Sequence, residues 1–216
     1  NGMIKRKQPF SGHHLRFQEK VQEKEKAKGR RMKSKAEFIH KCLNGLRVLD
    51  IGGCGYGEDN PYELDLKLAW SCVKQRTVVD RSKESDIVCD LNVFPLPALQ
   101  AEWDIATAFD VIEHLDSPVQ VLRWIPTNRL LISFPNCLSP IARRKEEKGF
   151  NHLYSFTWYT AMTLLKHGGW STHYWTYTIG KWSLFSRTVN VLGSLWPSVV
   201  ATGMMFDCYR RPESVV

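Results

Sequence analysis

Short apolar runs alternate with helical patterns from residue 47 onward. Two helical patterns, residues 118–124 and 157–167, lie after the fourth and fifth runs, and the second closes at Gly168 and Gly169. Strands that alternate with helices in this way predict an α/β fold with a mainly parallel sheet. The apolar runs have the length and composition of buried strands, and they comprise residues 47–51, 77–80, 86–90, 104–109, 129–134, 170–177 and 204–209.

The first 43 residues have a different character. Residues 12–43 are rich in Glu, Lys, Arg and Ala, which favours a helix, but their apolar positions are too sparse for a strong core-facing stripe. Residues 1–41 carry a net charge of +9, whereas the rest of the chain carries −1. We therefore predict a basic, largely helical N-terminal arm over residues 1–43 and a folded domain over residues 44–216. Such an arm could bind RNA, or it could be a solvated helix.

Composition is that of a globular protein, with 43% apolar and 24% charged residues. Six scattered cysteines without a C-x-x-C pair predict reduced thiols and a cytoplasmic location. Residues 188–206 contain no charged side chain, but Gly193 and Pro197 interrupt them. We therefore expect no transmembrane span, while peripheral membrane contact stays open.

A glycine cluster follows the first predicted strand, where residues 48–57 read V-L-D-I-G-G-C-G-Y-G. Glycines directly after a strand let a ligand approach the backbone closely, because no Cβ stands in the way. The carboxylate of Asp50, at the end of that strand, could receive a cationic amino group. Taken alone the cluster is weak evidence, since glycines also form ordinary tight turns.

Two further acids end the next two predicted strands. Asp80 ends the second strand, where a carboxylate can bind both hydroxyls of a ribose. Asp90 and Leu91 end the third and are followed by residues 95–97, Pro-Leu-Pro, which could lie along an adenine. Since the carboxyl ends of parallel strands share one edge of the sheet, all three acids should converge there. A dinucleotide is a poorer candidate, because the glycines lack the G-x-G-x-x-G spacing and the acids of residues 58–59 would repel phosphate.

Together these segments resemble class I S-adenosylmethionine (SAM)-dependent methyltransferases, especially the group with a V-L-E-H-L signature. The resemblance covers residues 45–211, and its motifs are residues 48–57, 79–80, 89–97, 103–115, 132–136 and 152–157. It implies a Rossmann-like fold with a mostly parallel seven-stranded sheet, an antiparallel last strand and helices on both faces. Two features depart from the group: the glycine signature is one residue longer, and the short spacing from Asp80 to Asp90 leaves no room for the usual intervening helix.

The resemblance also implies SAM as cofactor and S-adenosylhomocysteine as product, with no metal ligand expected. It places the first-strand motif at the methionine part of SAM, the second-strand end at the ribose, the third-strand end at the adenine, and the fourth-strand end along the pocket wall. The cofactor-binding residues it implies are Asp50, Gly52, Gly53, Cys54, Gly55, Asp80, Arg81, Asp90, Leu91 and Phe109.

Methyl transfer from SAM requires alignment of the acceptor with the methyl group, and a base only where the acceptor must lose a proton. His114 and His152 are the candidate catalytic bases, because both are expected above the same edge of the sheet. Asn136 could orient an acceptor or form a turn. The basic residues 143–145 could hold an anionic substrate or form a solvated face.

The sequence therefore predicts a SAM-dependent methyltransferase that acts at oxygen on a small-molecule or lipid-like acceptor. The resemblance extends to enzymes that methylate small molecules, quinones, lipids or surface sugars. Two alternatives are an RNA methyltransferase that uses the basic arm, and a non-catalytic binding or regulatory protein with the same fold.

Overall fold

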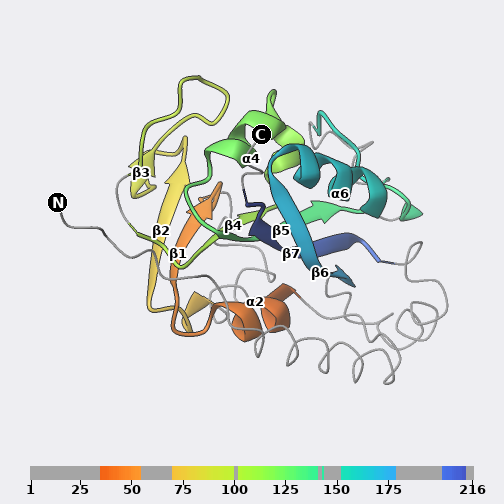
Figure 1. The fold of residues 1–216 in the computed structure, drawn as a ribbon, viewed down its shortest axis with the longest axis horizontal. Coiled ribbons are helices and arrows are strands. Elements are labelled where there is room, and N and C mark those ends of the chain that lie inside the picture. Colours follow the sequence, from red (N-terminus) through yellow and green to blue (C-terminus); the bar gives the residue numbers. More distant parts are fainter. Residues whose placement is uncertain are drawn as a thin grey trace. The chain divides into compact units, whose positions relative to one another are not determined.

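A computed structural model describes residues 35–54, 70–99, 102–140, 143, 152–178 and 201–212 of the chain. Seven strands within these residues form one sheet in the order β3-β2-β1-β4-β5-β7-β6 (Figure 1). Neighbouring strands from β3 to β5 are parallel, whereas β7 is antiparallel to both β5 and β6. This arrangement confirms the predicted Rossmann-like α/β fold with an antiparallel last strand.

The observed elements follow the predicted pattern closely. The strands are β1 (Arg47–Ile51), β2 (Gln75–Asp80), β3 (Ile87–Val88), β4 (Ile105–Phe109), β5 (Arg129–Pro135), β6 (Trp170–Thr178) and β7 (Gly203–Arg210). The described helices are α2 (Lys35–Leu43), the 3-10 helix η1 (Ile112–His114), α4 (Pro118–Trp124) and α6 (Trp158–His167).

Local chemistry explains where the two predicted helices begin. Pro118 occupies the first turn of α4, where its missing N–H costs no hydrogen bond. The hydroxyl of Thr157 accepts a hydrogen bond from the Thr160 N–H, and the Thr160 hydroxyl accepts one from the Thr157 N–H, which forms a capping box at the start of α6.

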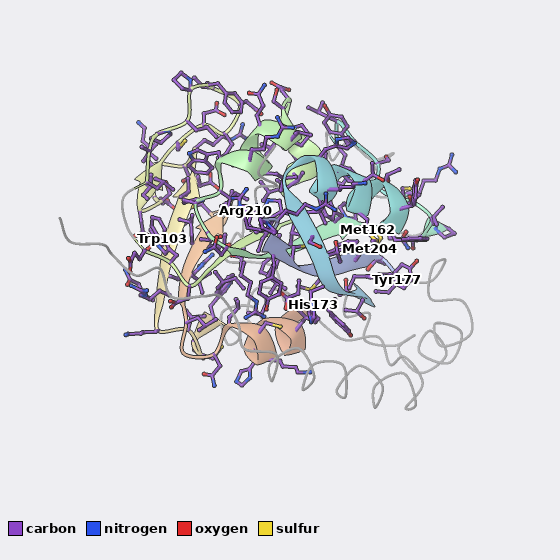
Figure 2. The ribbon with its side chains drawn as sticks, viewed as in Figure 1. Trp103, Met162, His173, Tyr177, Met204 and Arg210 are labelled. Carbon is purple, nitrogen blue, oxygen red and sulfur yellow. The ribbon has the colours of Figure 1, made fainter. Side chains whose placement is uncertain are left out.

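Both faces of the sheet are covered, as predicted. Successive residues of the central strands point to opposite faces, so these strands are buried on both sides and mostly apolar, with Asp50, Thr107 and Ser133 as buried polar exceptions. One face packs against α4 and α6, and the other packs against α2 (Figure 1). Near the end of the sheet, Met204 of β7 pairs with Tyr177 of β6, and both belong to the core that Met162 of α6 helps to cover (Figure 2).

The third predicted strand is shorter than expected. The pattern predicts residues 86–90, but only Ile87 and Val88 pair with β2. The six residues between β2 and β3 form a turn in which the Ser85 hydroxyl donates to the Ser82 and Asp80 carbonyls. No helix occupies this connection, in agreement with the short spacing noted in the sequence.

Helix α2 packs against the sheet although the sequence placed its residues in the N-terminal arm. Phe38, Ile39 and Leu43 are buried together with Val48 of β1 and Leu131 of β5. The compact unit that contains the sheet begins at Met32. Residues 1–34 lie outside the described part, so the division into an arm and a domain stays a prediction.

Neither a disulfide nor a membrane-spanning helix occurs in the described part of the chain. None of the six cysteines is paired with another, and burial raises the pKa of the Cys208 thiol to about 12. No described helix has the length and apolar character needed to cross a bilayer. Residues 188–200, most of the uncharged stretch discussed above, lie outside the described residues.

An ion pair ties the antiparallel strand to the parallel part of the sheet. Arg129 at the start of β5 donates two hydrogen bonds to the carboxylate of Asp207 on β7, at 3.0 and 2.8 Å. Both side chains are largely buried, at 24% and 10% exposure. Removal of one partner from such a buried pair destabilises the fold, because the other charge is left uncompensated.

We therefore predict that Asp207→Asn lowers the free energy of unfolding by about 2–3 kcal/mol, because Arg129 loses a charge-assisted partner. Urea denaturation followed by circular dichroism would measure the change. Asp104→Asn is the matched control, since Asp104 pairs with Arg47 at the surface, and its effect should be much smaller. Equal losses in the two variants would contradict this role for the Arg129–Asp207 pair.

Candidate functional site

The chain reverses its direction of winding between β1 and β4. Strand β1 lies between β2 and β4: the chain adds β2 and β3 on one side of β1 and then crosses to add β4 on the other side. In open α/β sheets, ligands bind outside the carboxyl ends of the strands at such a switch point. Within the described residues, the predicted cofactor residues at the ends of β1, β2 and β4 lie at this edge.

The turn after β1 requires glycine at its first position for a steric reason. Gly52 has a φ of +71°, and its N–H donates to the Val79 carbonyl of β2 at 2.8 Å. A Cβ at this position would lie 2.4 Å from Val111, the residue that precedes η1. The turn after β1 and the turn after β4 are therefore in close contact at the switch point.

Asp50 is buried beneath this turn and is held by two side chains of the protein itself. Nε and Nη2 of Arg76 donate to one carboxylate oxygen at 2.8 and 2.5 Å, and the Thr107 hydroxyl donates to the other at 2.6 Å. Burial raises the pKa of the Asp50 carboxyl, while Arg76 and Thr107 act in the opposite direction because they favour the ionised form. The carboxylate expected to receive an amino group from a ligand thus already has a cationic partner.

Arg76 extends this ion pair to the glycine turn. Its Nη2 donates to the Gly53 carbonyl at 3.1 Å, and its guanidinium lies 4.4 Å from the ring centroid of Trp70. A Cβ on Gly53 would come within 2.2 Å of the Asp50 carboxylate and 2.8 Å of Arg76. Gly53 therefore leaves room for the ion pair.

Sequence reasoning missed Arg76, Thr107 and Trp70. Arg76 stands just before the predicted strand 77–80, and the structure extends that strand back to Gln75. One signal could have identified Arg76: it is a charged residue next to an apolar run, and the neighbouring buried strand contains a carboxylate.

Asp80 connects the end of β2 with the glycine turn. Its two carboxylate oxygens accept hydrogen bonds from the Cys54 N–H at 3.2 Å and the Ser82 N–H at 2.9 Å. Each oxygen retains a second lone pair for a ligand hydroxyl. Arg81 follows at an exposed position, and Gly55 lies outside the described residues.

The remaining predicted cofactor residues take two different positions. Asp90 is exposed and accepts a hydrogen bond from the Asn92 N–H at 2.9 Å, while Leu91 is buried in the core. Asn92 in turn accepts one from the Asp116 N–H at 2.9 Å, which connects this loop to the segment after η1. Phe109 at the end of β4 is 4% exposed and packs against Trp70, with ring centroids 6.0 Å apart.

The two predicted catalytic histidines come together although they are 38 positions apart in sequence. The rings of His114, in η1, and His152 meet edge to face with centroids 4.7 Å apart. The N–H groups of Leu153 and Tyr154 both donate to the Glu113 carbonyl, at 2.8 and 3.3 Å. These backbone hydrogen bonds hold the segment after His152 against the turn that follows β4.

Asn136 forms a turn, one of its two predicted roles. Its amide donates to the Ala201 carbonyl at 2.8 Å, and its side-chain oxygen accepts from the Leu138 N–H at 3.2 Å. The side chain is fully buried. Of the predicted basic group 143–145, only Arg143 lies within the described residues, and it is exposed.

A Gly52→Ala substitution tests the contact between the two turns. We expect an overpacking cost of about 1–3 kcal/mol from Val111 in addition to about 1–2 kcal/mol of left-handed strain. Gly45→Ala is the matched control, because Gly45 has a φ of +73° and, its chain neighbours aside, no described residue has an atom within 4 Å of the position that a Cβ would take there. The control therefore reports the strain alone. Urea denaturation of both variants and of Gly52→Ala/Val111→Ala measures the difference. If Val111→Ala does not recover part of the loss, the proposed contact is wrong.

No protein-family model matches the sequence, and no curated protein sequence matches it significantly. Solved structures do share its fold. A SAM-dependent methyltransferase from Mesorhizobium loti has a TM-score of 0.54 at 14% identity, covering 81% of this chain and 95% of that chain. A SAM-dependent methyltransferase from Archaeoglobus fulgidus has a TM-score of 0.52 at 16% identity, covering 91% and 99%.

A third similar structure contains ligands. The 1,6-didemethyltoxoflavin-N1-methyltransferase of Burkholderia thailandensis, bound to 1,6-didemethyltoxoflavin and S-adenosylhomocysteine, has a TM-score of 0.52 at 13% identity, covering 97% of this chain and 94% of that chain. At such identities the similarity concerns the fold. The chain therefore has the Rossmann-like fold of the class I SAM-dependent methyltransferases.

Proposed function

We propose that this protein is a SAM-dependent methyltransferase that transfers a methyl group to oxygen of a small-molecule or lipid-like acceptor. The observation that carries the proposal is the convergence of three successive strand ends at the switch point. The Gly52–Gly53 turn follows β1, Asp80 ends β2, and Asp90 with Leu91 follows β3. The fold shared with SAM-dependent methyltransferases supports the same ligand.

Each part of SAM has a chemically suitable partner at this edge. The ribose hydroxyls would donate to the Asp80 carboxylate, which has lone pairs left after its bonds to Cys54 and Ser82. The adenine would lie against the loop of Asp90 and Leu91. The methionine part would lie on the glycine turn, where the backbone carries no side chain.

Arg76 changes the expectation for the methionine part. Because Asp50 is neutralised by Arg76, it is a weaker site for the amino group of SAM than an unpaired carboxylate would be. The Arg76 side chain is 28% exposed, and its guanidinium lies beside the glycine turn, where it can attract the methionine carboxylate. We therefore assign recognition of that carboxylate to Arg76 and place the amino group at the edge of the Asp50–Arg76 pair.

The acceptor would bind on the side of η1 and the segment that follows His152. The polar groups there are His114 and His152, which can take a proton from an acceptor hydroxyl or hold it in place. Apolar side chains follow directly in sequence: Leu153, Tyr154, Trp158 and Tyr159 are 56%, 39%, 40% and 65% exposed. A polar pair followed in sequence by exposed aromatic and aliphatic side chains suits a small or lipid-like molecule with one reactive oxygen.

The chemical step asks little of the protein beyond alignment. The acceptor oxygen attacks the methyl carbon while the carbon–sulfur bond breaks. The electron pair of the broken bond remains on the sulfur of S-adenosylhomocysteine. Alignment of this kind contributes about 7–11 kcal/mol to lowering a barrier. The RNA alternative depends on the basic arm, whose first 34 residues lie outside the described part of the chain.

We predict that calorimetric titration detects SAM and S-adenosylhomocysteine binding in the micromolar range. Asp80→Asn should weaken both about 10–100-fold, because it removes the charge that accepts the ribose hydroxyls. Glu102→Gln is the control, since Glu102 is an exposed acid at the opposite edge with a side chain 90% exposed. Folded protein that binds neither ligand would refute the proposal. Binding without transfer to any acceptor would favour the non-catalytic alternative.

A second prediction concerns the assignment of Arg76. Wild-type protein should bind SAM at least about tenfold more tightly than decarboxylated SAM, which lacks the methionine carboxylate. In Asp50→Asn/Arg76→Gln, both charges of the pair are removed, so no buried charge is left alone and the preference should fall toward one. Competition calorimetry measures the ratio in both proteins. An unchanged ratio in the double variant would show that another group recognises the carboxylate.

A further inference from the structure

Three potential metal ligands meet at the turn after β4. Glu113 and His114 belong to η1, and His152 is brought to them by the backbone hydrogen bonds from Leu153 and Tyr154 to the Glu113 carbonyl. One carboxylate oxygen of Glu113 and one ring nitrogen of each histidine all lie within 4.8 Å of one another. Two distant segments of sequence thus converge on one point next to the switch point.

Burial and contacts of the neighbouring residues hold Glu113 and His152 in place. Glu113 is fully buried, and its carboxylate oxygens and Nδ1 of His152 are inaccessible to solvent. Beyond His152, the hydroxyl of Tyr154 donates to the Asp116 carbonyl at 3.2 Å. Phe156 packs on Phe134 of β5 with centroids 4.8 Å apart, so the segment is anchored at both ends.

We propose that Glu113, His114 and His152 bind a divalent first-row cation such as Mn²⁺, Fe²⁺ or Co²⁺, and that this cation holds the acceptor oxygen. Two imidazoles and one carboxylate are a donor set suited to these ions. Three protein ligands leave open positions in an octahedral shell, which acceptor oxygens and water can fill. The second half of the proposal rests on the function proposed above, whereas metal binding itself does not.

The distances are compatible with such an ion. Ligand atoms at about 2.1 Å from a cation are at most about 4.2 Å apart. The cluster meets a limit of 4.8 Å, so small rotations of the histidine side chains, which both have some solvent exposure, bring the nitrogens to bonding distance. Glu113, which is fully buried, would provide the fixed ligand.

With a cation bound, His114 and His152 would act as metal ligands and not as bases. An acceptor hydroxyl bound to a divalent cation loses its proton more readily, because the cation stabilises the resulting oxyanion. The proton passes to solvent water, the oxygen forms its bond with the methyl carbon of SAM, and the sulfur keeps the electrons of the broken bond. His114 and His152 then act as ligands, and an acceptor with oxygen rather than an isolated nitrogen is favoured.

Metal binding can be tested without any acceptor. Full-length, tag-free protein would be treated with a chelator, desalted and titrated with Co²⁺, with visible ligand-field absorption as the readout, and separately with Mn²⁺, with loss of the free-ion paramagnetic resonance signal as the readout. We expect one ion per chain, with His114→Ala and His152→Ala each weakening binding at least about tenfold. Both histidines retain some exposure, so these variants should fold, which circular dichroism would verify.

Two control variants separate this cluster from other histidines. His167→Ala removes an exposed imidazole at the end of α6, and His13→Ala/His14→Ala removes the adjacent pair in the N-terminal sequence. Both should bind Co²⁺ as the wild type does. Absence of binding to the wild type, or binding that persists in His114→Ala and His152→Ala, would overturn the proposal.

The outcome is distinguishable from failure of the proposed function. SAM binding would be measured by calorimetry on chelator-treated wild-type protein, so that its result does not depend on a bound metal. If Co²⁺ binds at the cluster but SAM does not bind, the metal site stands and the methyltransferase proposal fails. If SAM binds and Co²⁺ does not, the histidines remain candidate bases and the metal site is wrong.

Discussion

Burial of the Asp50 carboxylate is the constraint on which the geometry of the candidate site depends. A carboxylate at 2% exposure in the middle of a parallel sheet is costly unless charge and hydrogen bonds compensate it. Arg76 from β2 provides an ion pair and Thr107 from β4 provides a hydrogen bond, so the Asp50 carboxylate connects the three strands that meet at the switch point. The same guanidinium reaches the Gly53 carbonyl, and the turn above the pair therefore has little freedom.

The glycines of the turn are explained by these internal contacts before any ligand is considered. A side chain on Gly52 would collide with Val111, and a side chain on Gly53 would collide with the Asp50–Arg76 pair. The Gly52–Gly53 turn therefore leaves a short piece of backbone without side chains. The Arg76 guanidinium contacts it at Gly53, and the Asp80 carboxylate accepts a hydrogen bond from the next residue, Cys54. A zwitterionic amino acid joined to a ribose, as in SAM, has the charges and hydroxyls that complement such an edge.

Much of the fold could be predicted from the sequence because buried parallel strands are apolar on both faces. The runs that became β1, β4 and β5 have this composition, and each was located within one residue. The third strand was overestimated because its pairing depends on a tight turn built by Ser82 and Ser85, which hydrophobicity does not report. Packing of α2 was not anticipated, since three buried side chains among many charged ones give only a weak periodic pattern.

The site was predicted less completely than the fold. Residues adjacent to strand ends could be placed at one edge, and the pairing of His114 with His152 agrees with their expected common location. The ion pair between Arg76 and Asp50 could not be predicted, because it depends on the register of β1 and β2 and on the rotamer of a long side chain. Nor could a cluster be foreseen that joins Glu113 to a histidine 39 positions away, since backbone hydrogen bonds of a loop create it.

The central claim is that SAM binds at the carboxyl edge of the sheet, and a crystal structure of the full chain with S-adenosylhomocysteine tests it most directly. We expect density for the ribose hydroxyls at the Asp80 carboxylate, with the methionine part on the Gly52–Gly53 turn and the thioether sulfur directed toward the side of His114 and His152. A hollow lined by Arg47, Thr77 and Trp103 lies at the opposite, amino edge of the strands. Density for the ligand in that hollow, with the carboxyl edge unaltered, would contradict the claim.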